Sequence, residues 1–301
     1  MTNATADIVE RFVTIDDVRT RTLSVAGTGP TILLLHGFTD SADTFRPVLA
    51  ELAALGRSAV AVDLPGAGYA PALGRPAIAA LDRFVDGFVS QHSEPGGVVL
   101  AGNSLGGFIA LRAAGRSELP IHAVAGLGPA GLAYHGRLAS LTSLLPRLEP
   151  ILSLADALPV PTAVVQWMAR MMFWQRLARR RGSASIAHRY ASHYRGLPDI
   201  ARIRRDLIAF GREDNLLDPA ALAAIDVPTL LIWGDRDPLA DVGGAPVLLD
   251  TVPDSRLVVL DDCGHCPQLE YPAEIAELLA GLPATALAGD TPTPLSKSRE
   301  K

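Results

Sequence analysis

Apolar runs and amphipathic stretches alternate along most of the chain, and this pattern predicts strands that alternate with helices. Continuous apolar runs of four to six residues indicate strands that are covered on both faces, as in a parallel sheet. The predicted strands comprise residues 11–15, 20–25, 31–35, 58–62, 98–101, 123–127, 229–234 and 256–260, the first two forming an antiparallel pair. Helices are predicted over 43–55, 78–92, 108–114 and 273–282. This order predicts an α/β fold with a mostly parallel central sheet, right-handed crossovers and helices on both faces.

The alternation stops between residues 129 and 214, where no strand pattern occurs. Helical patterns replace it over 138–151 (interrupted at Pro146 and Pro150), 164–181 and 186–194. This segment has thirteen arginines against six acids, a net charge of +7; because the whole chain carries −5, the remainder carries about −12. The pattern therefore predicts a core of residues 8–128 and 215–283, a helical insertion at 129–214, and a disordered tail at 284–301.

The composition narrows the class of protein. With 301 residues, 49% of them hydrophobic and 20% charged, the chain can bury a large globular core. A net charge of −5 gives no reason to expect a nucleic-acid partner. The first eleven residues lack the apolar run of a signal peptide, and no apolar stretch of about 18 residues occurs, so we expect no integral membrane segment and a cytoplasmic location. The two lysines, Lys297 and Lys301, both lie in the tail, which excludes lysine chemistry in the body of the protein.

A candidate nucleophile follows the strand predicted at 98–101. Residues 102–106 read Gly-Asn-Ser-Leu-Gly, with a predicted helix directly after them. On such a sharp turn between strand and helix, the glycines provide space and the hydroxyl of Ser104 points outward. A serine nucleophile needs a base and an acid that orients the base. Asp237 and His265 each come just after a predicted strand, at the edge where Ser104 is expected.

Five segments of the chain together resemble the α/β-hydrolase superfamily, and most of all its cap-bearing esterases and C–C-bond hydrolases. They are His36-Gly37-Phe38, the run 63–68, the run 102–107, the run 234–237 and Gly264-His265. The resemblance implies a Ser104–His265–Asp237 triad, an oxyanion hole made by the backbone amides of Phe38 and Leu105, and no cofactor or metal. It also implies that Asp235 and Asp63 shape turns, that His36 holds its loop, and that the insertion forms a cap.

The resemblance leaves the substrate open. Serine at position 104 argues against dehalogenases and epoxide hydrolases, which carry aspartate there. We expect a small molecule with an activated carbonyl, an ester or a lactone. C–C hydrolases commonly have a glycine-rich run after His-Gly and tryptophan after the catalytic histidine, whereas this chain has Phe38-Thr39-Asp40 and Cys266. A C–C hydrolase remains the alternative, and a ligand receptor or scaffold on this fold is a third interpretation.

Three further features carry weaker predictions. In the apolar cluster 166–174, Trp167, Met171 and Phe173 are candidates for lining the substrate pocket, with ordinary cap packing as an equal alternative. Cys263 and Cys266 form a C-x-x-C, but a thioredoxin-like unit needs further strands after it and a zinc site needs more ligands, so the pair is interpreted as filling space. The run Arg179–Arg181 is interpreted as a solvated face.

Overall fold

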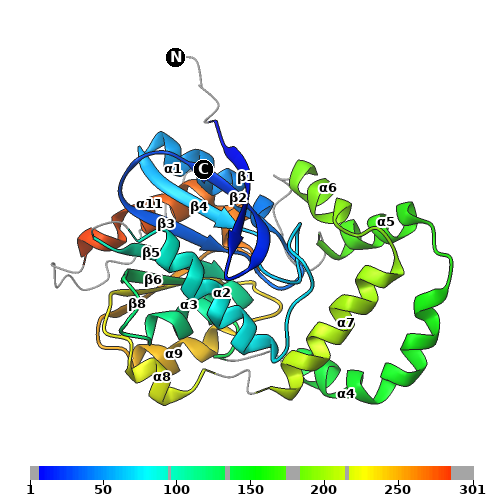
Figure 1. Ribbon diagram of the computed structural model, residues 1–301. Coiled ribbons are helices and arrows are strands. Elements are labelled where there is room, and N and C mark those ends of the chain that lie inside the picture. Colours follow the sequence, from blue (N-terminus) through cyan, green and yellow to red (C-terminus); the bar gives the residue numbers. More distant parts are fainter. Residues whose placement is uncertain (1–6, 94–95, 133–135, 174–183, 214–216, 286–301) are drawn as a thin grey trace, which may run out of the picture.

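The computed structural model describes residues 7–93, 96–132, 136–173, 184–213 and 217–285, and its centre is one twisted sheet (Figure 1). The strands are β1 (Val9–Ile15), β2 (Val18–Val25), β3 (Thr28–Leu35), β4 (Arg57–Val62), β5 (Val98–Asn103), β6 (Ile121–Leu127), β7 (Thr229–Gly234) and β8 (Ser255–Leu260). Their order in the sheet is β1-β2-β4-β3-β5-β6-β7-β8. The pairs β1/β2 and β2/β4 are antiparallel and all others are parallel. The mostly parallel sheet is confirmed.

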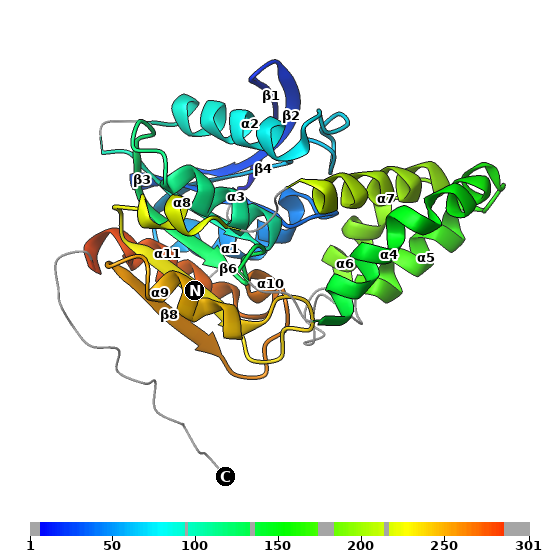
Figure 2. The same cartoon turned by 90° about the horizontal axis from the view of Figure 1, so that it is seen from below.

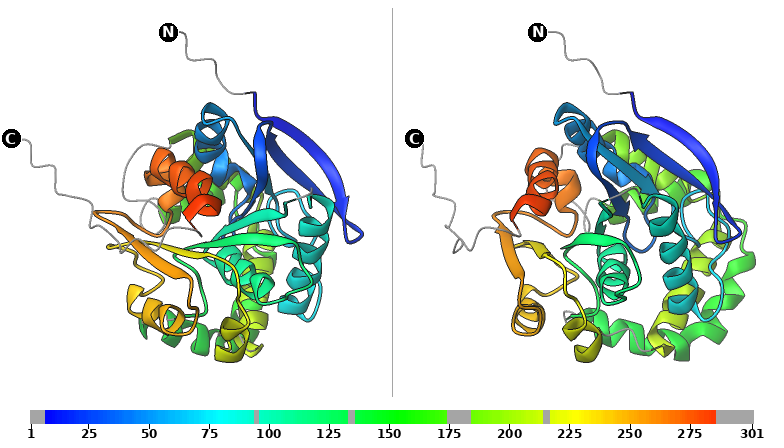
Figure 3. Two further views of the ribbon diagram at one scale, coloured as in Figure 1. Left: turned by 90° about the vertical axis from the view of Figure 1, so that its left-hand side faces the viewer. Right: turned by 60° about the vertical axis from the view of Figure 1, so that its left-hand side comes forward.

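Helices cover both faces of this sheet (Figure 3). They are η1 (Ala42–Phe45), α1 (Arg46–Ala54), α2 (Ala77–Gln91), α3 (Leu105–Ala114), α8 (Pro219–Ala223), η4 (Val242–Gly244), α9 (Ala245–Leu249), α10 (Pro267–Glu270) and α11 (Pro272–Thr285). Successive residues of one strand point to opposite faces of the sheet. Leu33 belongs to the hydrophobic cluster with α2 and α3, whereas Leu34 belongs to the cluster with α1 and α11. This arrangement explains why the strands carry no polar face.

The chain leaves the sheet after β6 and returns at β7, and between these strands the described residues form the helices of the predicted cap (Figure 2). They are α4 (Gly136–Leu152), α5 (Thr162–Met172), α6 (Ala184–Ser192) and α7 (Leu197–Arg212), with the short η2 (Ser153–Ala157) after α4. The cap helix α6 contacts η1, and α7 contacts α2.

Several predicted boundaries differ from the structure. The helix α4 continues through Pro146 and Pro150, so the predicted interruption is wrong. Packing of α4 against α7 and η2 compensates for the hydrogen bonds that the two prolines cannot donate. The helix predicted over 164–181 ends at Met172 in the structure, and Arg179–Arg181 lie outside the described residues. The last helix continues to Thr285, and the rest of the predicted tail, 286–301, also lies outside them.

Candidate active site

Ser104 lies at the turn between β5 and α3, where the backbone is strained. Its φ of 53° and ψ of −113° place it in a region that residues with a side chain rarely adopt. The turn packs so closely that a Cβ on Gly106 would lie 2.2 Å from the backbone oxygen of Leu35. Only glycine fits there, which explains the last glycine of the motif. Ser104 is half-buried, and it lies at the N-terminus of α3, where the helix dipole favours negative charge.

Asp237 and His265 form a buried hydrogen-bonded pair. The Oδ2 atom of Asp237 lies 2.7 Å from Nδ1 of His265. The other carboxylate oxygen accepts hydrogen bonds from the amides of Leu239 (2.8 Å) and Ala240 (3.1 Å), so the loop after β7 holds the carboxylate in place. An aspartate at Nδ1 fixes the tautomer that leaves Nε2 free to accept a proton. Asp235 instead accepts from the amide of Cys263 at 3.2 Å, which agrees with a role in the turn.

The loop that carries Ser104 is tied directly to the loop that carries His265. The side-chain amide of Asn103 donates to the carbonyl oxygens of Leu127 and His265, both at 2.9 Å. Gly128, with a φ of +49°, leaves room for the acid, since a Cβ there would lie 2.9 Å from Oδ2 of Asp237. Within the described residues no hydrogen bond joins Oγ of Ser104 to Nε2 of His265 in this conformation. Such contacts often form only when substrate is bound.

The loop after β3 reaches Ser104 from the other side. His36 donates from Nδ1 to the carbonyl of Gly37 (2.8 Å) and accepts at Nε2 from the amide of Leu64 (2.9 Å). Burial lowers its pKa, so the ring is neutral and both nitrogens are engaged in holding the loop. A Cβ on Gly37 would lie 3.3 Å from Cβ of Ser104. The amide of Phe38, the next residue, therefore lies in the neighbourhood of the serine.

Two cap tyrosines hold the residue that follows Phe38, and no sequence motif marks them. The hydroxyl of Tyr194 donates to the carbonyl of Thr39 at 3.1 Å, and the hydroxyl of Tyr190 lies 3.3 Å from Oγ1 of Thr39. Thr39 has a φ of 68°, which is unusual for a β-branched residue. Burial raises the pKa of Tyr194 to about 12, so its hydroxyl stays protonated and can donate. The cap thus helps to hold a strained loop of the core.

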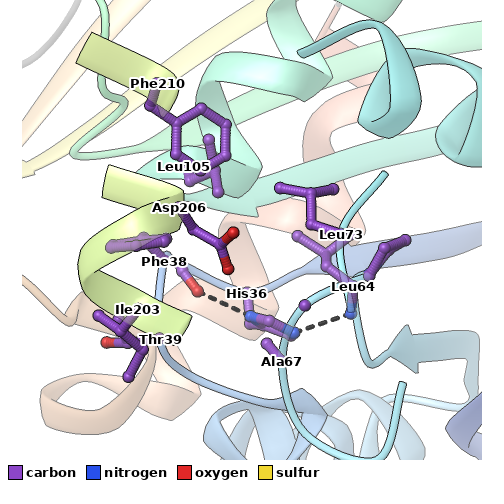
Figure 4. Close-up of a pocket in the computed structure, with 13 residues that line it drawn as sticks. His36, Phe38, Thr39, Leu64, Ala67, Leu73, Leu105, Ile203, Asp206 and Phe210 are labelled. Carbon is purple, nitrogen blue, oxygen red and sulfur yellow. Dashed lines mark hydrogen bonds between the residues drawn. The ribbon is translucent and has the colours of Figure 1, made fainter. Parts of the chain in front are cut away.

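A pocket opens next to Leu105, the residue after Ser104, between α7 and the loops after β3 and β4 (Figure 4). Ser104, Asp237 and His265 are not among its lining residues. Its walls include both predicted oxyanion residues, Phe38 and Leu105, together with Ile203, Asp206 and Phe210 of α7. The remaining lining residues are His36, Gly37, Thr39, Leu64, Pro65, Gly66, Ala67 and Leu73. The charged member, Asp206, is buried and accepts a hydrogen bond from Arg75 at 2.7 Å. The sequence patterns did not single out Asp206, and they predicted no helix over the residues of α7.

The three cap residues predicted to line the pocket lie elsewhere. Trp167 and Met171 are exposed, and neither contributes to the pocket in Figure 4. Phe173 is buried, but it packs on the ring of Tyr190, with 5.3 Å between ring centroids. The pocket described is formed by α7 and not by α5, and the role of these three residues in substrate binding stays a prediction.

A buried cluster of charges lies where α6 meets the core. Arg21 bridges Asp63 (2.9 Å) and Asp43 (2.7 Å), and Asp63 also accepts from the amides of Ala42 and Tyr69. Burial disfavours the charged form of Asp43, but the imidazole of His193 at 3.6 Å and hydrogen bonds from Arg21 and Arg46 outweigh it and lower the pKa. Nearby Asp40 lacks an arginine partner among these contacts, and burial raises its pKa to about 7. The contacts of Asp63 with Arg21 and with two backbone amides agree with the structural role expected for it.

The two cysteines are free and buried. Burial raises the pKa of the Cys266 thiol well above its ordinary value, so the thiol is unreactive. Among the described residues no group of three or more His, Cys, Asp or Glu side chains is arranged to hold a metal ion. In the same part of the chain, none of the helices combines the length and the apolar character needed to cross a membrane.

The sequence profile of the Alpha/beta hydrolase family matches residues 32–278, so the chain belongs to this family. Monoacylglycerol lipase ABHD6 from Mus musculus is 26% identical over 267 residues, which cover 84% of this chain and 75% of that protein. The 2-hydroxy-6-oxo-6-(2'-aminophenyl)hexa-2,4-dienoic acid hydrolase of Metapseudomonas resinovorans is 27% identical over 277 residues, 89% of this chain and 88% of that protein. The crystal structure of a membrane phospholipase A, a bacterial virulence factor, matches with a TM-score of 0.74 and 26% identity over 95% of this chain and 89% of that chain. The predicted fold and the hydrolase class are confirmed.

Proposed function

We propose that the protein is a cofactor-independent serine hydrolase that cleaves a carboxylic ester or lactone through an acyl-enzyme. Ser104 attacks the carbonyl carbon, and His265 takes the serine proton and delivers it to the leaving oxygen. Asp237 orients His265 and stabilises the imidazolium that forms. The amides of Phe38 and Leu105 hold the developing oxyanion, a contribution of about 3–4 kcal/mol for each donor. His265 then activates water, which releases the acid and restores Ser104.

The observation that carries this proposal is the contact of 2.7 Å between Asp237 and Nδ1 of His265. The partners come from loops 28 residues apart in sequence, and both are buried at the edge of the sheet where Ser104 lies. Asn103 supports it, because one side chain joins the serine turn to the backbone of His265.

The pocket favours a neutral ester over the C–C hydrolase alternative. A substrate of the dienoate kind carries a carboxylate, which needs a cation or several hydrogen-bond donors when it is buried. None of the 13 lining residues is arginine or lysine, and Asp206 adds a carboxylate. Asp206 is already paired with Arg75, so a dienoate carboxylate placed in this pocket would find no unpaired cation among the lining residues, whereas a neutral acyl or alcohol group would meet mostly apolar walls.

Labelling with a fluorophosphonate tests the nucleophile directly. The wild-type protein should label at Ser104, and Ser104→Ala should abolish labelling and lower turnover of p-nitrophenyl butyrate by about 10⁴–10⁶ with an unchanged melting temperature. Ser93→Ala, at an exposed serine, is the matched control and should behave as wild type. More than a tenth of wild-type activity in Ser104→Ala would show that another residue is the nucleophile. Absence of labelling and of turnover in the wild type would favour the receptor interpretation.

A direct comparison of substrates decides between the two hydrolase classes. The quantity to measure is kcat/KM for a short-chain p-nitrophenyl ester and for a 2-hydroxy-6-oxo-dienoate. We expect the ester to be preferred. A hundredfold preference for the dienoate would contradict the ester proposal while leaving the role of Ser104 intact.

A further inference from the structure

The outer side of the cap exposes an unusual amount of apolar surface. On α5, Val164, Trp167, Met168 and Met171 follow the i, i+3, i+4, i+7 spacing of one helical face, and all four are exposed. Trp167 is 56% exposed and Met168 is 58% exposed. The opposite face of α5 is buried through Val165 and Ala169. This helix is therefore apolar on the side where a surface helix of a globular protein is normally polar.

The preceding segment shows the same property. On α4, Leu144, Leu148 and Ile151 are exposed at the same helical spacing. Leu154 in η2 and Leu158 in the following loop are 78% and 58% exposed. We call the exposed side chains from Leu144 to Met171 the outer cap face. Figure 1 shows α4 and α5 apart from each other in the cap, so the outer cap face consists of two apolar stretches, one that begins on α4 and one on α5.

Positive charge accompanies these apolar side chains. Arg147 lies on α4 between Leu144 and Leu148, and Arg170 lies on α5 between Met168 and Met171; both arginines are exposed. The cap carboxylates in the described part of the chain are occupied elsewhere. Glu149 and Asp156 bind Arg204, Asp199 accepts from the amide of Arg195, Asp206 binds Arg75, and Glu213 accepts from the first amides of α2. The positive charge of this face is therefore not neutralised by those carboxylates.

We propose that the outer cap face docks on a lipid bilayer that contains anionic headgroups, with the apolar side chains in the interface and the arginines at the headgroups. The transfer of tryptophan and methionine side chains from water to the interface lowers the free energy, and each arginine is attracted by the negative surface. The inference does not depend on the chemistry assigned to Ser104.

A second copy of this chain fits the same surface less well. A two-fold contact would bring Arg147 and Arg170 of one copy towards the same arginines of the other, because such interfaces use one patch twice. A contact between cap and core would require apolar area on the core. The exposed large apolar residues of the described core are Val9, Phe12, Leu55, Tyr69, Val247 and Val259. Val9 and Phe12 lie on β1, and Phe12 contacts Tyr69, whereas the other three come from separate segments.

Vesicle co-sedimentation of the full chain tests the proposal. The probes are vesicles of phosphatidylcholine alone and of phosphatidylcholine with 30% phosphatidylglycerol, at low and at high salt. We expect at least tenfold stronger binding to the anionic vesicles at low salt. Trp167→Ser with Met168→Ser should weaken that binding by about tenfold or more. Arg147→Gln with Arg170→Gln should weaken it by about tenfold and remove most of the salt dependence. Leu55→Ser, at a residue of the core that is 47% exposed, is the matched control and should bind as wild type.

Tryptophan fluorescence locates the contact. The chain has three tryptophans, so the experiment uses Trp174→Phe as its background. Because Trp233 is completely buried, a shift of the emission to shorter wavelength on anionic vesicles is then expected to come from Trp167. Trp167→Phe should lose this shift and still sediment with vesicles. Three results would overturn the proposal. They are no binding to either vesicle, binding that the cap variants leave unchanged, and a dimer in analytical ultracentrifugation that Trp167→Ser dissociates, which would assign the face to a second copy.

Discussion

The edge of the sheet that carries the candidate active site and the outer side of the cap use their side chains in opposite ways. At the edge, Asp237 has both oxygens engaged and Asn103 joins two loops, so each group has one position. On the cap, Trp167 and Met168 have little protein around them. Preorganised polar groups serve bond breaking, because they need no rearrangement in the transition state. Exposed apolar groups contribute to the free energy of binding only when a membrane or a partner covers them. The comparison supports our proposals that the core carries out the chemistry and that the outer cap face docks on a surface.

The largest expected effect lies in the core. Asp237→Asn should lower kcat by about 10³–10⁴, because the amide can stabilise the wrong tautomer of His265. Asp235→Asn, two residues earlier, should lower kcat by less than about tenfold, since Asp235 contacts the amide of Cys263 and the side chain of Arg236 and not His265. Steady-state kinetics with a p-nitrophenyl ester measures both. Equal losses, or a larger loss at Asp235, would reverse the assignment of the acid.

The next effect concerns the junction of cap and core. The pKa of Asp40 is raised from 3.8 to about 7 by burial, so this group favours folding fully below pH 3.8 and loses that contribution as the pH rises through about 7. Across this window it should lower the free energy of unfolding by up to about 1.4 kcal/mol per pH unit. The titratable groups that interact with it are His193, Asp43, Cys266, Tyr190 and Tyr194.

Asp40→Asn should make this decline shallower, because asparagine does not titrate. Its side-chain oxygen can still accept the hydrogen bond from the backbone amide of Ser41. Urea unfolding at pH 5, 6, 7 and 8 measures the slope. Asp16→Asn, at a carboxylate that is 45% exposed, is the control and should keep the slope of the wild type. A variant at Asp40 with the same slope as wild type would show that Asp40 is ionised throughout this range.

A smaller effect tests whether the cap also serves the chemistry. Tyr194→Phe removes the hydrogen bond to Thr39, which follows the oxyanion residue Phe38. We expect kcat to fall by about tenfold with KM unchanged, because one oxyanion donor becomes less well placed. The affinity for a trifluoromethyl ketone should fall in parallel. Tyr271→Phe, whose hydroxyl binds the carbonyl of Asp261, should leave both quantities unchanged. A change in KM alone would confine the cap to substrate binding.

The smallest effect concerns substrate charge. Asp206→Asn should raise kcat/KM for a p-nitrophenyl hemisuccinate relative to a p-nitrophenyl butyrate by about fivefold, because it removes a like charge from the pocket. Asp199→Asn, also on α7 but outside the pocket, should leave this ratio unchanged. The same ratio in wild type and in Asp206→Asn would place the acyl chain in another part of the protein.

The sequence by itself determined the sheet and the positions of Ser104, Asp237 and His265. Buried parallel strands consist of local runs of apolar residues, and each candidate residue follows such a run within a few positions. The local sequence is therefore enough to predict both the strands and these residues. The tertiary structure alone decided which cap helix lines the pocket. Apolar residues at helical spacing look the same whether they face a pocket, a core or solvent, and Trp167 and Phe173 lie on the same helical segment with opposite burial. The contacts of Tyr194 with Thr39 and of Asp206 with Arg75 join residues 155 and 131 positions apart, and no local pattern records such pairs.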